Sequence, residues 1–246
     1  MSSTKTRSVS DPNKKSSANF LWVLLALLLV AALVIGLVVW QSQGKRTSHL
    51  AERDNTEVNA VMEYNPADGA ITLKSQSAGE NAEEVGLYED YSCPHCGELA
   101  NATDERMLQE IDNGKLVVNV HPLNFLDRNA EGHSTASLAA LLALADKGET
   151  NAWWNLREVI FEEQQDIYNQ WSDDDFANAA KELGASEDAV KAIRDGAYID
   201  EAKKIAETNA NYLQEKTGNV SSPRILQDGK DVEVQDPAQW IDKVLS

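Results

Sequence analysis

The sequence predicts an α/β domain that carries a helical insertion and follows one membrane-spanning helix. Three observations lead to this fold class. A strand, a helix and a second strand follow one another between residues 85 and 120, in the order of a βαβ unit. Almost every signal from Asp127 to Gly218 is helical, and the Asp228-Gly229 pair that comes next is typical of a β-hairpin.

An uncharged stretch near the N-terminus predicts the membrane-spanning helix. Residues 20–40 contain no charged side chain, and 21 residues at about 1.5 Å per residue cross a hydrocarbon core of roughly 30 Å. Trp22 and Trp40 suit the two membrane interfaces. A cleaved signal peptide is the alternative, since Ser42-Gln43-Gly44 resembles a cleavage site, but the apolar part of a signal peptide usually has only about 7 to 15 residues. We therefore expect a retained anchor.

Basic residues on the two sides of this stretch predict its orientation. Four precede it in residues 1–19, whereas Lys45, Arg46 and Arg53 follow it. By the positive-inside rule, residues 1–19 form a cytoplasmic tail and the chain after the anchor is extracytoplasmic, where disulfides persist. The predicted location is therefore the cell membrane, which the chain crosses once.

The overall charge argues against nucleic-acid binding. The formal net charge is −18, and because residues 1–19 carry +3, the remainder carries −21. A domain this acidic repels the phosphate backbone of a nucleic acid.

The chain after the anchor divides into a linker and one domain. Residues 41–69 begin polar and then show a loose helical spacing up to a turn signal at Asn65-Pro66. We predict a partly helical linker that is too short for a dimerisation module, so a monomer is expected. The domain covers residues 70–246 and opens with short strands at 70–73 and 85–88.

The second half of the βαβ unit follows the second of these strands. A helix ends at Asn113-Gly114, as a glycine C-cap should, and residues 115–120 are typical of a strand covered on both faces. The helical insertion then spans about residues 127–217. Its aromatic cluster of Trp153, Trp154 and Phe161 is expected in the core.

A hairpin and a closing helix complete the predicted domain. Strands at 224–227 and 230–234 flank the Asp228-Gly229 turn. Asp236-Pro237 begins the closing helix, with an aspartate N-cap and a proline at the first helical position.

The only two cysteines stand in the motif Cys93-Pro94-His95-Cys96, at the strand-to-helix turn of the βαβ unit. Unpaired N–H groups and the positive dipole end of a helix favour an anion, so we predict a Cys93 thiolate at neutral pH. Pro94 suits the first helical turn, and His95 can add positive charge or a donor. Cys96 lies deeper along the helix and is assigned the resolving role.

Two other roles are open to the cysteine pair. A zinc site would need two further ligands, for which His95, His121 and His133 are available, but the sequence lacks the second paired motif of most structural zinc sites. A purely structural disulfide across two intervening residues would close so small a loop that it would stabilise little. A redox-active pair is therefore the main prediction.

The motif and its surroundings resemble the DsbA family of thiol-disulfide oxidoreductases. The resemblance rests on Tyr88-Glu89-Asp90-Tyr91 before the cysteines, His121-Pro122-Leu123 after a strand, the helical insertion, and Val220-Ser221-Ser222-Pro223 before the hairpin. It covers about residues 70–246 and is closest to the membrane-anchored DsbA-like oxidases of Gram-positive bacteria, the MdbA type. It implies a thioredoxin fold interrupted by a helical domain.

The resemblance also implies a substrate-binding site opposite the dithiol. Pro223 corresponds to the family's cis-proline, which lets the backbone of Ser222 face the sulfur and pair with an extended substrate peptide. An ordinary trans proline at a strand start is the alternative. Ser221 and Ser222 stand where Gly and Thr or Val are commoner, a departure at the positions that bear on substrate preference and redox potential.

A second departure from the pattern concerns proton transfer. Families of this kind use a buried acid six residues before the first cysteine to move the proton of the second thiol, and here that position is Leu87. Glu89 lies two residues further on the same strand face and is the candidate proton relay, acting through water.

The expected function is thiol-disulfide exchange outside the cytoplasm. We expect the chain to donate its Cys93–Cys96 disulfide to secreted proteins during oxidative folding. By the resemblance, a membrane quinone-linked oxidase of the DsbB or vitamin K epoxide reductase-like type reoxidises it, and no cofactor or metal is required. The alternatives are a disulfide reductase or isomerase on the same fold, and a non-catalytic peptide- or zinc-binding module.

Overall fold

The computed structural model describes the chain except for residues 1–15, 78, 80 and 129–130, and it leaves the side chains of residues 16–19 and 37–45 undescribed. The chain divides into two compact units, Met1–Lys45 and Arg46–Ser246. Every strand of the described chain belongs to the second unit.

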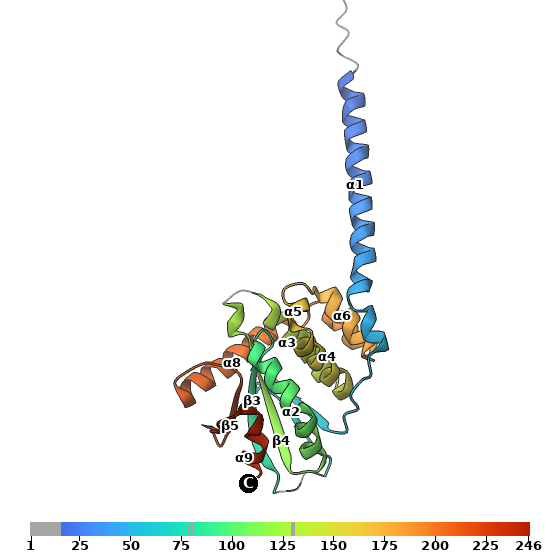
Figure 1. The fold of residues 1–246 in the computed structure, drawn as a ribbon. Helices are drawn as coiled ribbons and strands as arrows, with labels where there is room; N and C mark the ends of the chain where they lie inside the picture. Colours follow the sequence, from blue (N-terminus) through green and yellow to red (C-terminus); the bar gives the residue numbers. More distant parts are fainter. Residues whose placement is uncertain (1–15, 78, 80, 129–130) are drawn as a thin grey trace, which may run out of the picture. The chain divides into compact units, whose positions relative to one another are not determined.

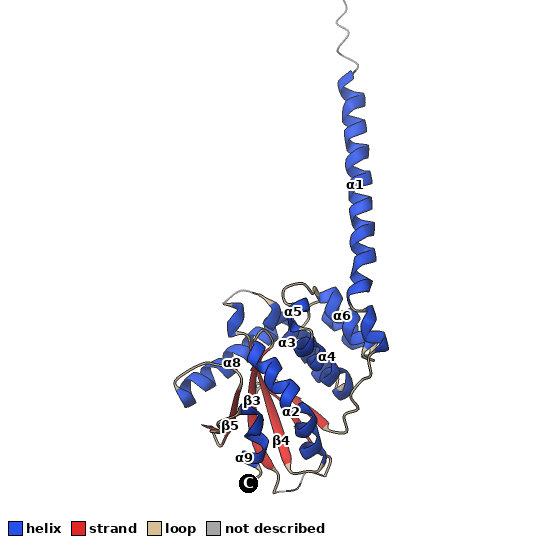
Figure 2. Ribbon diagram, in the orientation of Figure 1, coloured by secondary structure: helices blue, strands red, loops and turns tan. Residues whose placement is uncertain are grey.

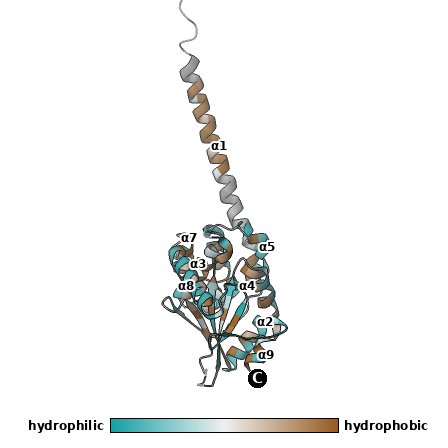
Figure 3. Ribbon diagram, turned by 90° about the vertical axis from the view of Figure 1, so that its left-hand side faces the viewer, coloured by the Kyte–Doolittle hydropathy of each residue, from teal (hydrophilic) through white to brown (hydrophobic). Residues whose placement is uncertain are grey.

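Most of α1 (Ser16–Arg46) belongs to the first unit. Its large apolar side chains from Phe20 to Ile35 are exposed, and Figure 3 colours this stretch as hydrophobic. Within the described part of the chain, no helix is both long and apolar enough to span a membrane. The membrane-spanning helix therefore stays a prediction, and the predicted tail of residues 1–19 lies largely outside the described residues.

Among the described residues, six strands form one sheet in the second unit. The strand order is β1-β2-β4-β3-β5-β6, in which β3 and β4 are parallel and all other neighbours are antiparallel. The strands are β1 (Val61–Asn65), β2 (Ala70–Lys74), β3 (Glu83–Asp90), β4 (Leu116–Leu123), β5 (Arg224–Gln227) and β6 (Lys230–Asp231). With α2 (Pro94–Asp112) between them, β3 and β4 form the predicted βαβ unit.

Helices cover both faces of this sheet (Figures 1 and 2). α2 and α9 lie over one face, and α8 crosses the other, where Leu213 clusters with Tyr88 and Leu226. The other helices of the insertion pack together beyond the C-terminal end of β3. The bounds are α3 (His133–Asp146), α4 (Thr150–Glu162), α5 (Gln164–Ile167), α6 (Asp173–Glu182), α7 (Glu187–Arg194), α8 (Ile199–Thr217) and α9 (Trp240–Val244), with short 3₁₀ turns η1 (Ser48–Glu52), η2 (Phe125–Asp127) and η3 (Pro237–Gln239).

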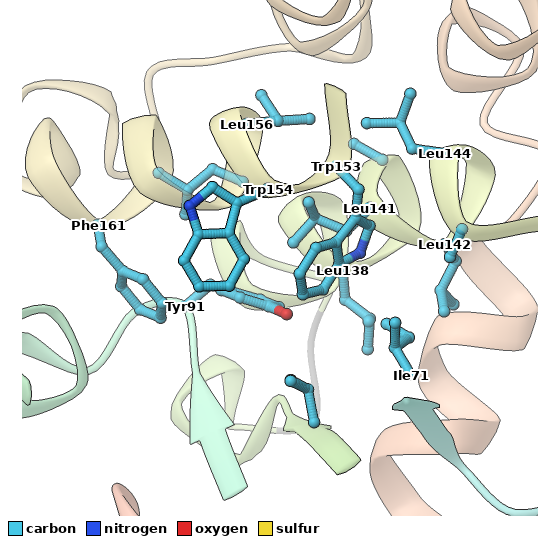
Figure 4. Close-up of a cluster of buried hydrophobic side chains, with 14 of the residues drawn as sticks. Ile71, Tyr91, Leu138, Leu141, Leu142, Leu144, Trp153, Trp154, Leu156 and Phe161 are labelled. Carbon is cyan, nitrogen blue, oxygen red and sulfur yellow. The ribbon is translucent and has the colours of Figure 1, made fainter. Parts of the chain in front are cut away.

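The core of the helical insertion lies between α3 and α4. α3 is apolar on nearly every side, and its leucines are fully buried. Trp153 and Trp154 point into the same core, and Tyr91 and Phe161 lie beside them (Figure 4). Because burying one large apolar side chain contributes roughly 2 to 3 kcal/mol, this cluster fixes the insertion against the cysteine turn that follows Tyr91. The prediction that these aromatic residues form core is confirmed.

The structure differs from the predicted linker of residues 41–69. The second unit already begins at Arg46, and it includes η1, β1 and the buried Leu50. Between η1 and β1 the chain runs along α4, where Asn155 Oδ1 accepts the backbone N–H of Thr56 at 2.8 Å. The pairing of β1 with β2 and the hydrogen bond of the Thr56 backbone to Asn155 hold this part of the chain in place. Such hydrogen bonds of the backbone leave no periodic pattern in the sequence.

The end of the domain also differs from the prediction. β6 covers only two residues, where a strand over 230–234 was predicted. Asp236 does cap the next turn by accepting the N–H of Ala238, but that turn is the 3₁₀ turn η3, and α9 begins only at Trp240.

Candidate active site

The cysteine motif lies at the carboxyl end of β3, where the chain turns into α2. Cys93 is the N-cap residue of α2 with an extended backbone (φ −86°, ψ 115°), and Pro94 takes the first helical position. The Cys93 carbonyl oxygen accepts the N–H groups of Cys96 at 3.0 Å and Gly97 at 3.3 Å. The first cysteine therefore stands at the N-terminal end of α2, as predicted.

Donors surround the Cys93 sulfur. The side chain is only 6% exposed, and its thiol donates to the carbonyl oxygen of Ser222 at 3.5 Å. A hydrogen bond with the Cys96 thiol lowers the pKa of Cys93 against the effect of burial, and the Ser222 side chain and the N–H groups of Cys96 and His95 lower it further, to about 5. The thiolate is the stable form of Cys93 at neutral pH.

Ser222 brings a further donor to this sulfur. Its peptide bond to Pro223 is cis. The Ser222 hydroxyl is buried and has no hydrogen-bond partner among the described residues while Cys93 is a thiol. A Cys93 thiolate would accept that proton, which is why the serine favours the anion.

The Cys96 sulfur has the opposite environment. It is 2% exposed, and the backbone N–H of Asp90 approaches it at 3.5 Å. Burial, followed by the neighbouring Cys93, raises the pKa of Cys96 well above its ordinary value. Cys96 is therefore a thiol at neutral pH when the pair is reduced, as the resolving role requires.

His95 lies on the outer side of the turn. Its Nδ1 is 2.9 Å from Glu98 Oε2, and the ring is exposed. The hydrogen bond and charge of Glu98, and then the charge of Cys93, raise the pKa of His95. Because Glu98 compensates most of this charge, His95 acts on Cys93 mainly through its backbone N–H.

Glu89 has a different role from the predicted proton relay. Its two carboxylate oxygens accept the Nε–H and Nη2–H of Arg157 at 2.8 and 2.7 Å, and Asp104 accepts from Nη1 at 2.5 Å. The arginine is 1% exposed and lies over the rings of Trp154 and Phe161. Since both oxygens of Glu89 are bound to Arg157, we assign Glu89 to this buried ionic cluster and not to proton transfer.

Asp90 is a site residue that the sequence analysis did not single out. It is fully buried, and its carboxylate accepts from Ser92 N–H at 3.0 Å, Ser134 Oγ at 2.5 Å and Leu126 N–H at 3.2 Å. Burial outweighs these donors and raises the pKa of Asp90 to about 6. Asp90 thus ties the cysteine turn to η2 and α3. The signal in the sequence was an acid at the end of the strand, three residues before the first cysteine.

Gln164 is a second missed residue. It follows α4 and its Nε2 donates to the carbonyl oxygens of Tyr91 at 2.8 Å and Cys93 at 3.2 Å. The helical insertion therefore holds the backbone on both sides of Ser92. No local pattern in the sequence marks this contact, because 71 residues separate Gln164 from Cys93.

A groove of about 380 Å³ lies on the Pro223 side of the motif. Its walls are formed by α2, β5 and η3, and its lining is mostly apolar, with His95, Leu99, Pro223, Ile225 and Pro237 among its residues. A peptide that pairs with the backbone of Ser222 can place a side chain there.

The histidines that were considered as zinc ligands lie in other surroundings. His121 stacks on Tyr88 at 4.5 Å and is 3.2 Å from Asn209 Oδ1, and His133 is buried beside the ring of Tyr168. Within the described residues, no group of three or more histidine, cysteine, aspartate or glutamate side chains could hold a metal ion.

Comparisons with known proteins agree with this geometry. The family model described as thioredoxin matches residues 76–244. The structure of the thiol-disulfide oxidoreductase MdbA from Corynebacterium diphtheriae is similar, with a TM-score of 0.76 and 42% identity over 79% of this chain and 98% of that one. MdbA from Corynebacterium matruchotii has the same TM-score and 37% identity over 81% of this chain and 98% of its own.

A longer protein contains a similar region. The serine/threonine-protein kinase PknE of Mycobacterium tuberculosis is 26% identical over 212 residues, which are 84% of this chain and 36% of the kinase. The chain thus spans about a third of the length of the curated relatives that it matches.

Proposed function

Because this chain belongs to the DsbA-like thiol-disulfide oxidoreductases of the thioredoxin fold, we propose that it oxidises the dithiols of polypeptides outside the cytoplasm. The observation that carries the proposal is the contrast between the two sulfurs. The donors around Cys93 favour its thiolate, and a disulfide bond cannot use those donors as well as an anion does. The reduced form is thereby stabilised, which makes the disulfide form an oxidant.

The size of the shift in redox potential indicates whether the chain acts as an oxidant or a reductant. With the pKa lowered from 9.0 to about 5, the thiolate favours the reduced form at pH 7 by about two units, or about 3 kcal/mol. For a two-electron couple this raises the potential by about 60 mV. Such a shift moves a thioredoxin-like couple toward the range of protein disulfide isomerase and DsbA.

The exchange proceeds in two attacks. A substrate thiolate attacks Cys93 Sγ, the Cys93–Cys96 bond breaks, and Cys96 leaves and takes up a proton. A second substrate thiolate then attacks the substrate sulfur of the mixed disulfide, and Cys93 leaves as its stabilised thiolate. Two electrons have passed from the substrate dithiol to the cysteine pair.

Ser222 and the groove beside Pro223 would hold the substrate during these steps. When Cys93 is protonated, the Ser222 carbonyl oxygen accepts its thiol proton. In the thiolate, disulfide and mixed-disulfide forms Cys93 has no proton to donate, so this oxygen can accept an N–H of an extended substrate peptide.

We also propose that α1 anchors the chain in the membrane, with the second unit on the extracytoplasmic side. The support is the run of exposed apolar side chains from Phe20 to Ile35, far larger than the patches that a soluble protein exposes. A membrane quinone-linked oxidase of the DsbB or vitamin K epoxide reductase-like type would then reoxidise the pair on the same surface.

A redox equilibrium tests the proposed direction. The full-length chain is equilibrated in glutathione buffers, and the fraction of reduced cysteines gives the potential. We expect a value of about −210 mV or higher, together with rapid oxidation of a reduced, unfolded test protein. A potential near that of cytosolic thioredoxin, about −270 mV, would overturn the oxidase assignment in favour of a reductase.

A further inference from the structure

A second hollow, separate from the Pro223 groove, lies beside the cysteine turn. Its volume is about 620 Å³, and Ser92 and Pro94, the two chain neighbours of Cys93, form one wall. The loop around η2 and the residues after α5 form the other, among them Leu126, Arg128 and Tyr168. The two hollows share no lining residue, so they are separate surfaces, and each includes a residue next to or near Cys93 in the motif.

The rim of this hollow exposes apolar surface. Among the described residues of the second unit, the exposed large apolar side chains are Leu126 at 36%, Tyr168 at 46% and Tyr212 at 39%. Two of these three line the hollow beside the active site. An exposed apolar patch with a polar rim is typical of a surface that binds a partner.

Arg128 adds an uncompensated positive charge at the same place. The other arginines that the structure describes each form an ion pair with a carboxylate, and they are Arg46, Arg53, Arg106, Arg157, Arg194 and Arg224. Arg128 has no such partner among the described residues, in a chain with 40 acidic residues.

The acids near Arg128 are already bound to other groups. The Asp127 carboxylate accepts the N–H groups of Gly132, Ser134 and Thr135 at the start of α3. Glu131 pairs with Lys203 at 2.9 Å. The guanidinium of Arg128 is therefore available to a carboxylate from outside the chain.

The backbone of Arg128 is also unusual. Three non-glycine residues of the described chain have positive φ: Arg128 at 53°, Asn169 at 54° and Asp228 at 51°. Asp228 belongs to the hairpin turn, and asparagine adopts this conformation readily. Arginine does not, so the fold holds Arg128 in a strained conformation on the wall of the hollow, which is a common feature of ligand-binding positions.

We propose that this hollow binds the substrate polypeptide beside the reacting cysteine, outside the Pro223 groove, with an apolar side chain on Leu126 and Tyr168 and a carboxylate on Arg128. The inference rests on the proposed function for the nature of the partner. It assigns the chain a preference for thiol-bearing segments that combine an apolar residue with an acid within a few residues of the cysteine.

Binding of labelled peptides tests this preference without any redox chemistry. The peptides carry serine in place of cysteine, one phenylalanine, and one glutamate placed in turn at each of four positions on either side of the serine. Matched sets carry glutamine or lysine at the same place. The full-length chain should bind the best glutamate peptide about three- to fivefold more tightly than its glutamine counterpart, as expected for one partly exposed ion pair, and the difference should shrink at high salt.

Two charge-reversed variants locate the effect. R128E should prefer the lysine peptide, whereas R194E, which changes the charge equally on a helix outside the hollow, should keep the glutamate preference. Y168S should weaken binding of all the peptides, and Y212S should not. A glutamate preference that is absent, or that survives in R128E, would overturn the proposal, as would self-association of the chain that R128E abolishes.

The outcome separates this inference from the proposed function. Peptides that bind with an Arg128-dependent preference, together with a redox potential of the chain near that of thioredoxin, would leave the docking surface in place and overturn only the oxidase direction. If peptides with two cysteines are oxidised to their disulfide, but at the same rate with glutamate or glutamine, the docking surface is overturned and the oxidase direction stands.

Discussion

The two sulfurs at the start of α2 stand three residues apart, and the chain surrounds them in opposite ways. Cys93 has the thiol of Cys96, the Ser222 side chain and backbone N–H groups directed at it, and its pKa falls to about 5. Cys96 is more deeply buried, and burial, followed by the neighbouring Cys93, raises its pKa above its ordinary value. The cysteine at the N-cap, Cys93, is thus a good leaving group, whereas the cysteine in the first turn of the helix, Cys96, is a protonated resolving thiol. Position at the helix start, more than residue identity, decides the role.

Removing either sulfur should give the largest effect. Cys93→Ser should abolish exchange. In Cys96→Ser the Cys93 thiolate can still attack a disulfide of an oxidised substrate and release one substrate thiolate, and the resulting mixed disulfide should accumulate, which mass spectrometry detects. In the wild-type chain at pH 6, alkylation should modify Cys93 faster than Cys96 by a factor on the order of 100 or more, because only Cys93 is a thiolate.

A control variant tests the donor that contributes most. Cys96→Ala removes the hydrogen bond to Cys93 that serine can still donate, so the pKa of Cys93 should be higher in the alanine variant than in the serine variant. Equal alkylation of the two cysteines in the wild type would contradict the contrast between them.

The buried ionic cluster of Arg157, Glu89 and Asp104 should affect the stability of the fold and not the reactivity of Cys93. Arg157→Met leaves Glu89 and Asp104 buried without their partner, and the free energy of unfolding should fall by about 3 to 5 kcal/mol in a denaturant titration. Arg194→Met breaks an exposed pair and should cost about 1 kcal/mol or less. The alkylation rate of Cys93 should stay near that of the wild type. A stability loss equal to that of the control would show that the cluster has another charge state.

Asp90 should make stability depend on pH. Its pKa is raised from 3.8 to about 6, so between these values the folded state binds more protons than the unfolded state, and stability falls as pH rises. Relative to Asp90→Asn, the wild type should lose about 2 to 3 kcal/mol between pH 4 and pH 6.5, measured by denaturant titrations across that range. If the free energies of unfolding of the two proteins changed with pH in the same way, the raised pKa of Asp90 would be contradicted.

The Ser222 hydroxyl should have the smallest effect. Ser222→Ala removes one donor to the thiolate, so the pKa of Cys93 should rise by about one unit and the potential at pH 7 should fall by about 30 mV. Ser221→Ala is the matched control and should change neither quantity. If the two variants behave alike, the unpaired hydroxyl does not act on the sulfur.

The sequence predicted the parts of this site that follow one another along the chain. The motif Cys93-Pro94-His95-Cys96, its place between a strand and a helix, and the hairpin at Asp228-Gly229 all depend on local signals, and the structure has them where they were expected. The register of Ser222 and Pro223 beside the dithiol came only from the family resemblance.

The remaining parts depend on contacts between distant residues. Glu89 looked like a free acid near the site, because nothing next to it in the sequence shows the Arg157 that binds it 68 residues later. A hint existed, since Arg157 stands at helical spacing from Trp153, Trp154 and Phe161, where a core residue is expected. A buried arginine requires buried acids, but the sequence does not say which ones.

The central claim is that the fold holds Cys93 as a thiolate, and a titration of that sulfur tests it most directly. The ultraviolet absorbance of the thiolate is followed with pH in the reduced full-length chain, with Cys93→Ser as the background. The structure predicts a midpoint near pH 5 that the serine variant lacks. A midpoint near pH 9, the ordinary value for a cysteine thiol, would contradict the account and remove the driving force for oxidation.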